Sequence, residues 1–148
     1  MSTETQTLLD RHEIQDVRSR LARALDTRDW EAFRNLFTDQ VDVDLPQLGA
    51  PKGVMTPEQL CNLFQSAFRL SQETQQLYSN FLVDLDADQA RLTSSLLGHH
   101  QAKGVDGGDE VTLRARYLDQ LVRTPQGWKI TGMTISAVSL SGNPRIFG

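Results

Sequence analysis

Along the first third of the chain, apolar side chains recur every three or four positions, as expected for one face of an α-helix. The members of this stripe are Ile14, Val17, Leu21, Ala24 and Leu25. Asp10 is the predicted N-cap, because Glu13 stands three positions later as a capping-box partner. Leu9 and Ile14 are placed to form a hydrophobic staple. We therefore expect the first helix to start at Asp10 and to end just before Asp26.

Two further helices are predicted downstream. Asp29 is a potential cap for a short second helix, whose inward side chains are Phe33, Leu36 and Phe37. Thr56 is the expected cap of the third helix, followed by Pro57 at the first helical position and Gln59 at the capping-box position. The predicted buried face of the third helix consists of Leu60, Leu63, Phe64, Ala67 and Phe68.

Most of the remaining chain alternates with period two, which indicates β-strands. A short strand is expected at 41–45, followed by a loop from Pro46 to Gly53. Longer strands are expected at about 75–85, 90–103, 110–123 and 128–140, with turns or loops between them. In the last strand the alternation changes phase between Ile130 and Met133, which predicts a bulge near Thr131 and Gly132.

Helices that precede a run of hairpin-connected strands are typical of the α+β class. The sequence shows neither an internal repeat nor a linker, so a single domain over 1–148 is expected. The helices should pack on one face of an antiparallel sheet. A curved sheet that wraps around helices tends to enclose a cavity, which makes the interior of the sheet the first place to look for a site.

Charge and composition restrict the classes of partner. The net charge is −4, and the 15 Lys and Arg residues are spread along the 148 positions without a basic cluster, which argues against nucleic acid. The polar N-terminus lacks a secretory pattern, and no apolar stretch approaches the ~20 residues that span a bilayer. We expect a cytoplasmic protein with a small-molecule ligand and no membrane partner. Cys61 is the only cysteine, so an internal disulfide is impossible, and a buried thiol is expected.

Asp26 and His100 are the two residues most suggestive of chemistry. Asp26 follows the apolar stripe of the first helix, and His100 lies in a predicted strand. Such groups could meet only inside a pocket, where an Asp–His pair is a plausible proton-transfer device. Adjacent strand residues face opposite sides, so only one of His99 and His100 can enter a cavity, and the pattern leaves open which. The alternative is structural: Asp26 as a surface carboxylate at a helix end, and a histidine that is merely packed.

Two polar rows on the predicted strands are less specific. Gln76, Tyr78 and Asn80 share one face of their strand and could line a pocket, or could form the solvated face of the sheet. Tyr117, Asp119 and Arg123 form a similar row, for which cross-strand ion pairing is a sufficient explanation. Three histidines and one cysteine show no spacing typical of zinc, so no metal site is predicted.

Several segments together resemble SnoaL-like proteins of the nuclear transport factor 2-like superfamily. The similarity includes the run from Ile14 to Leu45, with the segment 25–30 (LDTRDW) at its centre, and the later segments 80–88, 116–119 and 127–130. It extends over nearly the whole chain. The resemblance implies a cone-shaped, curved antiparallel sheet wrapped around three N-terminal helices, which is a cystatin-like α+β barrel.

Within that superfamily, the enzymatic pattern of scytalone dehydratase is the most similar. The resemblance implies that Asp26 and His100 lie in the cone and serve the elimination of water. Hexachlorocyclohexane dehydrochlorinase is similar at Asp26 as well. The chain departs from both at Gln76, which stands where these families have a pocket histidine. Leu25 and Leu45 replace the tyrosines that help to polarise the substrate carbonyl in scytalone dehydratase. Any remaining proton transfer should therefore run through His100.

The sequence thus predicts a cofactor-independent lyase or isomerase for a small apolar or aromatic, polyketide-like substrate. Asp26 and His100 are the expected catalytic residues, and the tail from Asn143 to Phe147 is a possible cover of the mouth. Substrate contacts are expected from Gln76, Tyr78, Asn80, Leu25, Leu45, Phe64, Phe68 and Tyr117. The alternative is a non-catalytic module of the same fold that binds small molecules or oligomerises. A homo-oligomer, either dimer or trimer, is expected under both hypotheses.

Overall fold

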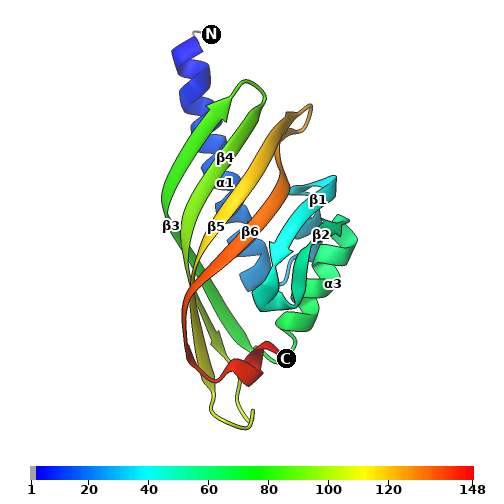
Figure 1. Ribbon diagram of the computed structural model, residues 1–148, viewed down its shortest axis with the longest axis vertical. Helices are drawn as coiled ribbons and strands as arrows, with labels where there is room; N and C mark the ends of the chain where they lie inside the picture. Colours follow the sequence, from blue (N-terminus) through cyan, green and yellow to red (C-terminus); the bar gives the residue numbers. More distant parts are fainter. Residues whose placement is uncertain (1–2) are drawn as a thin grey trace.

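The computed structural model describes residues 3–148 and consists of helices packed against one long, curved sheet (Figure 1). In chain order the elements are α1 (Thr3–Thr27), α2 (Trp30–Arg34), β1 (Phe37–Leu45), the 3-10 turn η1 (Pro46–Leu48), β2 (Ala50–Met55), α3 (Pro57–Ala67), β3 (Glu73–Asp86), β4 (Gln89–Gln101), β5 (Glu110–Thr124), β6 (Gly127–Gly142) and the 3-10 turn η2 (Pro144–Phe147). The α+β class and the helices wrapped by the sheet agree with the prediction.

The strand order of the sheet is β2-β1-β6-β5-β4-β3. Strands β3 to β6 form the predicted antiparallel meander. The expectation of a wholly antiparallel sheet was wrong, because β1 pairs in parallel with β6, and the sheet is mixed. These two strands are far apart in the sequence, so no hairpin dictates their relative direction. The sheet curves without closing, with β2 and β3 as its two edges (Figure 1).

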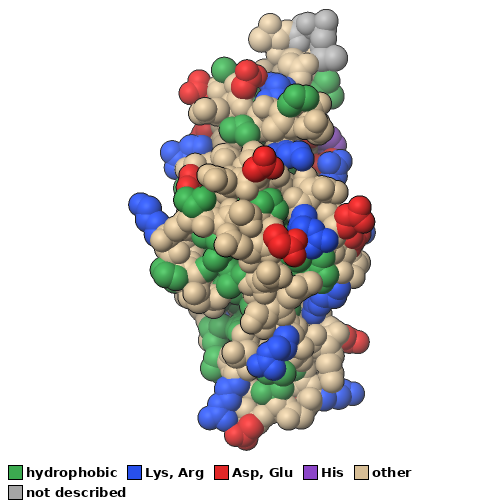
Figure 2. Space-filling model, turned by 90° about the vertical axis from the view of Figure 1, so that its right-hand side faces the viewer, with side chains coloured by type: hydrophobic (Ala, Val, Ile, Leu, Met, Phe, Trp, Pro, Cys, Tyr) green, Lys and Arg blue, Asp and Glu red, His purple; other side chains and the backbone are tan. Residues whose placement is uncertain are grey.

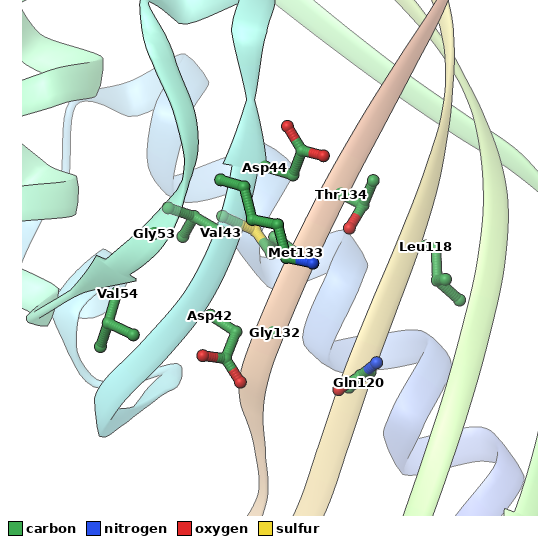
Figure 3. A pocket seen from close by; sticks show the side chains of 11 residues that line it. Asp42, Val43, Asp44, Gly53, Val54, Leu118, Gln120, Gly132, Met133 and Thr134 are labelled. Carbon is green, nitrogen blue, oxygen red and sulfur yellow. The ribbon is translucent and has the colours of Figure 1, made fainter.

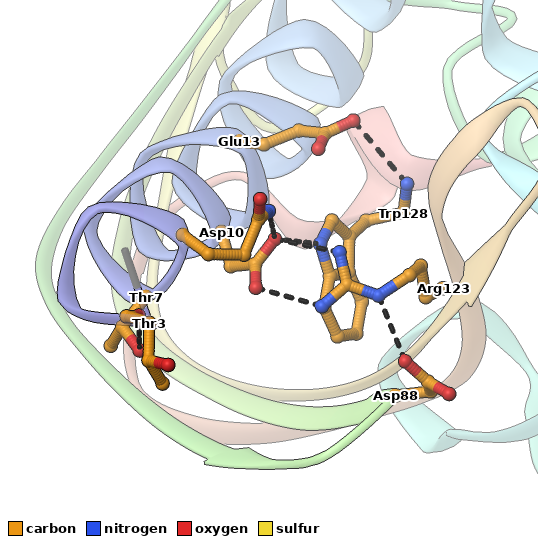
Figure 4. Close-up of polar contacts among 8 residues, drawn as sticks. Thr3, Thr7, Asp10, Glu13, Asp88, Arg123 and Trp128 are labelled. Carbon is orange, nitrogen blue, oxygen red and sulfur yellow. Dashed lines mark hydrogen bonds and ion pairs between the residues drawn. The ribbon is translucent and has the colours of Figure 1, made fainter. Parts of the chain in front are cut away.

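Helix α1 starts earlier than predicted, and Asp10 lies inside it rather than at its N-cap. The carboxylate of Asp10 instead accepts two hydrogen bonds from Arg123, at 2.8 and 2.7 Å, and one from the indole nitrogen of Trp128 at 3.2 Å (Figure 4). Glu13 accepts from the backbone nitrogen of Trp128, and Leu9 is exposed, so neither the capping box nor the staple forms. The local pattern of a cap is also compatible with a buried acid whose partners are distant in sequence.

The starts of the other two helices were predicted correctly. Asp29 accepts a hydrogen bond from the backbone nitrogen of Ala32. Thr56 and Gln59 form the reciprocal capping box, with bonds of 3.2 and 2.9 Å. Cys61 is buried in α3, as expected. The segment predicted as the loop from Pro46 to Gly53 contains η1 and most of β2, which pairs with β1. This strand was not predicted because proline and glycine residues, which are frequent in this segment, are typical of loops.

Bulges in β6 and in β3 change which side chains of these long strands face the helices. The predicted bulge in β6 is present, since Gln120 pairs with Gly132 and Leu121 with Ile130, which skips Thr131. A second bulge in β3 was not predicted: Asn80 has a φ of +56°, and the register shifts between Ser79 and Leu82. The inner face therefore changes from even to odd positions along β3. This change turns Asn80 to the outside.

The core lies between the inner face of the sheet and the helices. Ile14, Leu21 and Leu25 of α1 and Phe64 of α3 are buried in it. On the face shown in Figure 2, acidic and basic side chains are interspersed. No helix among residues 3–148 is both long enough and apolar enough to cross a membrane.

Candidate functional site in the cone

His100 lies on the inner face of β4, near one end of the sheet. The even positions of β4 are buried from Ala90 onward, so His100 is only 2% exposed, whereas His99 faces outward and contacts Thr112. The question that the sequence left open is therefore answered: His100 is the inward histidine. Regular alternation along an unbulged strand places it there.

Both ring nitrogens of His100 have partners. Nδ1 lies 2.9 Å from the hydroxyl of Ser71, and Nε2 lies 3.3 Å from the amide nitrogen of Gln76. An amide nitrogen can only donate, so Nε2 accepts, and Nδ1 carries the proton and donates to Ser71. The rings of Phe68 and Phe147 pack edge-on against the imidazole, with centroids 4.6 and 4.8 Å away. The imidazole is thus held in one orientation by two polar and two aromatic neighbours.

The surroundings of His100 favour the neutral form. Burial, reinforced by the nearby charges of Arg28 and His99, lowers the pKa of His100 to about 4. An imidazole with this pKa is unprotonated at pH 7, which is the state needed to accept a proton.

Asp26 lies on the other side of strand β3 from the imidazole. Both of its carboxylate oxygens accept a hydrogen bond from the backbone nitrogen of Gln76, at 3.1 Å, and one lies 3.4 Å from the hydroxyl of Thr74. Within residues 3–148, no hydrogen bond or ion pair joins Asp26 to His100. Because β3 is an edge strand, its free N–H groups need partners, and Asp26 supplies one. Burial raises the pKa of Asp26, and the bond from Gln76 opposes that rise.

Gln76 therefore connects the two predicted catalytic residues. Its backbone contacts Asp26, and its side chain contacts His100. The side chain lies over Gly98, the residue paired with it on β4. A Cβ atom at position 98 would come within 2.8 Å of the amide oxygen of Gln76. Gly98 thus provides the space in which this amide reaches the imidazole.

A cavity of about 20 Å³ adjoins these residues. This volume accommodates about one water molecule. Of the residues predicted to contact substrate, Leu25, Phe64, Phe68, Gln76, Tyr78 and Tyr117 line the cavity together with His100. Leu45 is buried elsewhere in the core, and Asn80 lines a hollow on the outer face because of the β3 bulge. Phe147 of η2 also lines the cavity, so the tail does cover this end of the cone.

A buried ion pair near the cavity was not predicted. Arg18 of α1 and Asp119 of β5 contact each other through two hydrogen bonds, and neither side chain is exposed. The cross-strand pairing expected for Asp119 is wrong, because Asp119 pairs with Arg18 of α1. Arg123 pairs both with Asp10 of α1 and, at 2.9 Å, with Asp88 in the turn between β3 and β4. The sequence does indicate a buried partner for Arg18, because Arg18 lies between Ile14 and Leu21 in the apolar stripe, where an unpaired charge would be destabilising.

A larger hollow lies away from these residues. It has a volume of about 510 Å³ and lies on the outer face of the sheet, where β1 runs parallel to β6 (Figure 3). Asp42 and Asp44 border it, paired in register with Gly132 and Thr134. His100 is on the inner face, so this hollow is separate from the cone. Among residues 3–148, no three His, Cys, Asp or Glu side chains converge as a metal site would require.

The curved sheet wrapped around the helices is the fold of the nuclear transport factor 2-like superfamily. Within it, residues 6–134 match the model of the SnoaL-like domain, and the chain belongs to this family. No curated protein matches the sequence significantly.

Solved structures with the same fold cover nearly the whole chain. A protein from Kribbella flavida is 21% identical, with a TM-score of 0.87 over 95% of this chain and 97% of its own. A Novosphingobium aromaticivorans protein, provisionally described as an aromatic ring hydroxylase, is 28% identical, with a TM-score of 0.83 over 95% and 98%. A type 2 hexachlorocyclohexane dehydrochlorinase, LinA, is 17% identical, with a TM-score of 0.82 over 95% and 93%. The TM-scores of the first and third structures show that they share the fold of this chain, and at 21% and 17% identity the similarity shows the fold alone.

Proposed function

We propose that this protein is a cofactor-independent, dehydratase-like lyase or isomerase for a small apolar or aromatic, polyketide-like compound. The observation that carries the proposal is the environment of His100: a neutral imidazole on the inner face of the cone, between two phenylalanine rings. A neutral imidazole can accept a proton at pH 7, and apolar walls exclude water from the reaction.

In the proposed reaction, Nε2 of His100 removes a proton from a carbon next to a carbonyl group. The imidazolium then returns the proton either to another carbon, which gives isomerisation, or to a hydroxyl group that leaves as water. Ser71 holds the opposite nitrogen and keeps Nε2 directed toward Gln76. General acid–base catalysis of this kind contributes about 10²–10⁴ in rate. Asp26 acts as a positioning residue, through the backbone of Gln76.

Access to His100 requires movement of one wall. A cavity of about 20 Å³ is far below the ~300 Å³ of the smallest typical ligand pockets. Phe147 covers the imidazole from η2, near the C-terminal end. The tail is held by Asn143, which donates to the backbone oxygens of Asp106 and Gly108, and by an ion pair between Arg145 and Asp106. This short segment is the proposed lid.

Solved relatives support the reaction class. The dehydrochlorinase LinA is named for an elimination. A second Novosphingobium aromaticivorans structure, 17% identical and with a TM-score of 0.83 over 95% of this chain and 92% of its own, is provisionally described as a scytalone dehydratase. Elimination of water or of hydrogen chloride requires a base within reach of a C–H bond, which is the role proposed for His100.

The proposal is tested by proton exchange. A panel of hydroxylated aromatic ketones is incubated with the protein in D₂O, and loss of the signal of the proton next to the carbonyl is followed by NMR. We expect exchange with the wild type and none with His100→Asn. His99→Asn is the matched control, because His99 lies on the same strand and faces outward. Exchange that survives His100→Asn would eliminate His100 as the base.

An alternative function has one observation in its favour. Leu77, Leu82 and Leu97 are 53%, 72% and 41% exposed on the outer face of β3 and β4, which suits an oligomerisation module with a filled cone. Under this alternative, no compound of the panel exchanges protons or raises the melting temperature. The chain then sediments as a dimer or trimer, which Leu82→Asp dissociates. Proton exchange that depends on His100 decides for the enzyme.

A further inference from the structure

We infer that Gln76 is a second catalytic residue, whose side-chain amide donates a hydrogen bond to the carbonyl oxygen of the substrate. The inference rests on the proposed function and adds to it the group that stabilises the negative charge formed on the carbonyl oxygen. It gives Gln76 a role that a histidine at this position could not fill in the same way, because the amide changes neither charge nor protonation state.

The side-chain amide of Gln76 donates to Nε2 of His100, which is the nitrogen that must accept the proton in the proposed reaction. The two nitrogens are 3.3 Å apart, and both residues are buried. When a substrate C–H bond takes the place at Nε2, the amide loses its acceptor. A buried donor without an acceptor is destabilising, because it has lost its hydrogen bonds to water and gained none in return. A substrate that brings an acceptor to the same place avoids this cost.

A carbonyl group beside the reacting carbon meets this requirement. Its oxygen is two bonds away from the carbon that carries the acidic hydrogen, so the oxygen reaches the amide when the hydrogen reaches Nε2. Proton transfer then breaks the C–H bond, forms an N–H bond on His100 and moves the electron pair to the carbonyl oxygen. The product is an enolate, whose negative oxygen accepts from Gln76. The same proton later leaves His100 for carbon or for the departing hydroxyl group.

Gln76 is also held in place before any ligand binds. Asp26 accepts its backbone N–H with both oxygens at 3.1 Å, and Gly98 leaves the space that its side chain fills. A donor fixed in advance needs no reorganisation when charge develops, which makes such groups effective in catalysis. A weakly basic imidazole in an apolar site especially requires this help, because an unstabilised enolate would return the proton at once.

The test uses 4-nitrophenol, whose anion resembles a planar enolate and absorbs visible light. The full-length wild type, Gln76→Leu and His100→Asn are saturated with the probe, and the ionisation constant of the bound probe is measured from its absorbance. We expect an ionisation constant about tenfold or more higher in the wild type than in Gln76→Leu. Gln75→Leu is the matched control, because Gln75 is exposed on the opposite side of β3. It should behave as the wild type does.

Further variants separate this role from folding and from the proposed function. Gly98→Ala keeps the amide but displaces it, so an intermediate ionisation constant is expected with an unchanged far-UV spectrum. His100→Asn should retain the wild-type ionisation constant while losing proton exchange. If the wild type exchanges no protons but Gln76→Leu still loses the effect on the probe, the base is wrong and the donor stands. Equal ionisation constants in the wild type and Gln76→Leu, or failure of the probe to bind, overturn the inference.

Discussion

Arg18 of α1 and Asp119 of β5 form a bidentate ion pair with no exposed surface on either side chain. The guanidinium carbon of Arg18 lies 4.8 and 4.3 Å from the ring centroids of Tyr78 and Tyr117, which both line the cavity. Arg18 also donates to the hydroxyl of Tyr78 at 3.3 Å. Burial raises the pKa of Asp119, and the contact with Arg18 opposes this rise. The pair fixes α1, and with it Asp26, against the sheet.

Removing one member of this pair should be strongly destabilising. Arg18→Met leaves a buried carboxylate without a partner, and we expect the free energy of unfolding to fall by about 3–5 kcal/mol. Urea unfolding followed by tryptophan fluorescence measures this change. The double variant with Asp119→Leu should recover much of the loss, because no charge remains buried. Arg20→Met is the control: Arg20 forms only an exposed pair with Asp16 and should cost less than about 1 kcal/mol. Equal costs at positions 18 and 20 would contradict this interpretation.

The features of the fold that could be predicted from the sequence are those encoded by residues close together in the chain. The capping box of Thr56 and Gln59 and the bulge at Thr131 are encoded by neighbouring residues, and both were predicted correctly. Asp10 was misassigned because its partner Arg123 lies 113 residues away. The bulge at Asn80 was missed because nothing in the alternation of β3 requires a residue with positive φ there.

The site was predictable only in part, for a related reason. Both parities of β4 carry apolar as well as polar residues, so the alternation alone was not used to decide between His99 and His100. The depth of Asp26 was also not determined, because it depends on which side of an edge strand the end of α1 reaches. Gln76 was recognised as a polar pocket residue, but its contact with His100 depends on the absence of a side chain at Gly98 on the neighbouring strand.

Asp10 should contribute stability that is lost in acid. Its hydrogen bonds with Arg123 lower the pKa of Asp10 to about 2 in the folded protein. An aspartate in the unfolded chain ionises near ~3.9. The folded state therefore binds fewer protons between these values, and this contribution, complete above about pH 4, disappears as the pH falls toward about 2. Urea midpoints across this range should depend less on pH in Asp10→Asn than in the wild type. Asp16→Asn, at a half-buried position of the same helix, should retain the wild-type dependence.

His100 should make stability depend on pH in a higher range. The pKa of His100 is about 4 in the folded protein, whereas a histidine in the unfolded chain ionises near ~6.5. Between these values the unfolded chain binds more protons, so stability rises with pH and is complete above about 6.5. The contribution amounts to about 3 kcal/mol. We expect denaturation curves of His100→Asn to lose this dependence and those of His99→Asn to keep it. A His100 resonance that titrates near 6.5 in the folded protein would refute the assignment.

Phe147 should control access to His100. Its ring covers the imidazole from η2 and lines the cavity, so Phe147→Ala should open a path from solvent to Nε2. We expect carbethoxylation of His100 by diethyl pyrocarbonate, followed by mass spectrometry at pH 7, to become roughly tenfold or more faster in the variant. His99 serves as an internal reference, because its half-exposed ring should react at the same rate in both proteins. If the two rates for His100 agree after normalisation to His99, the tail is not the wall that opens, and substrate must enter the cone by another route.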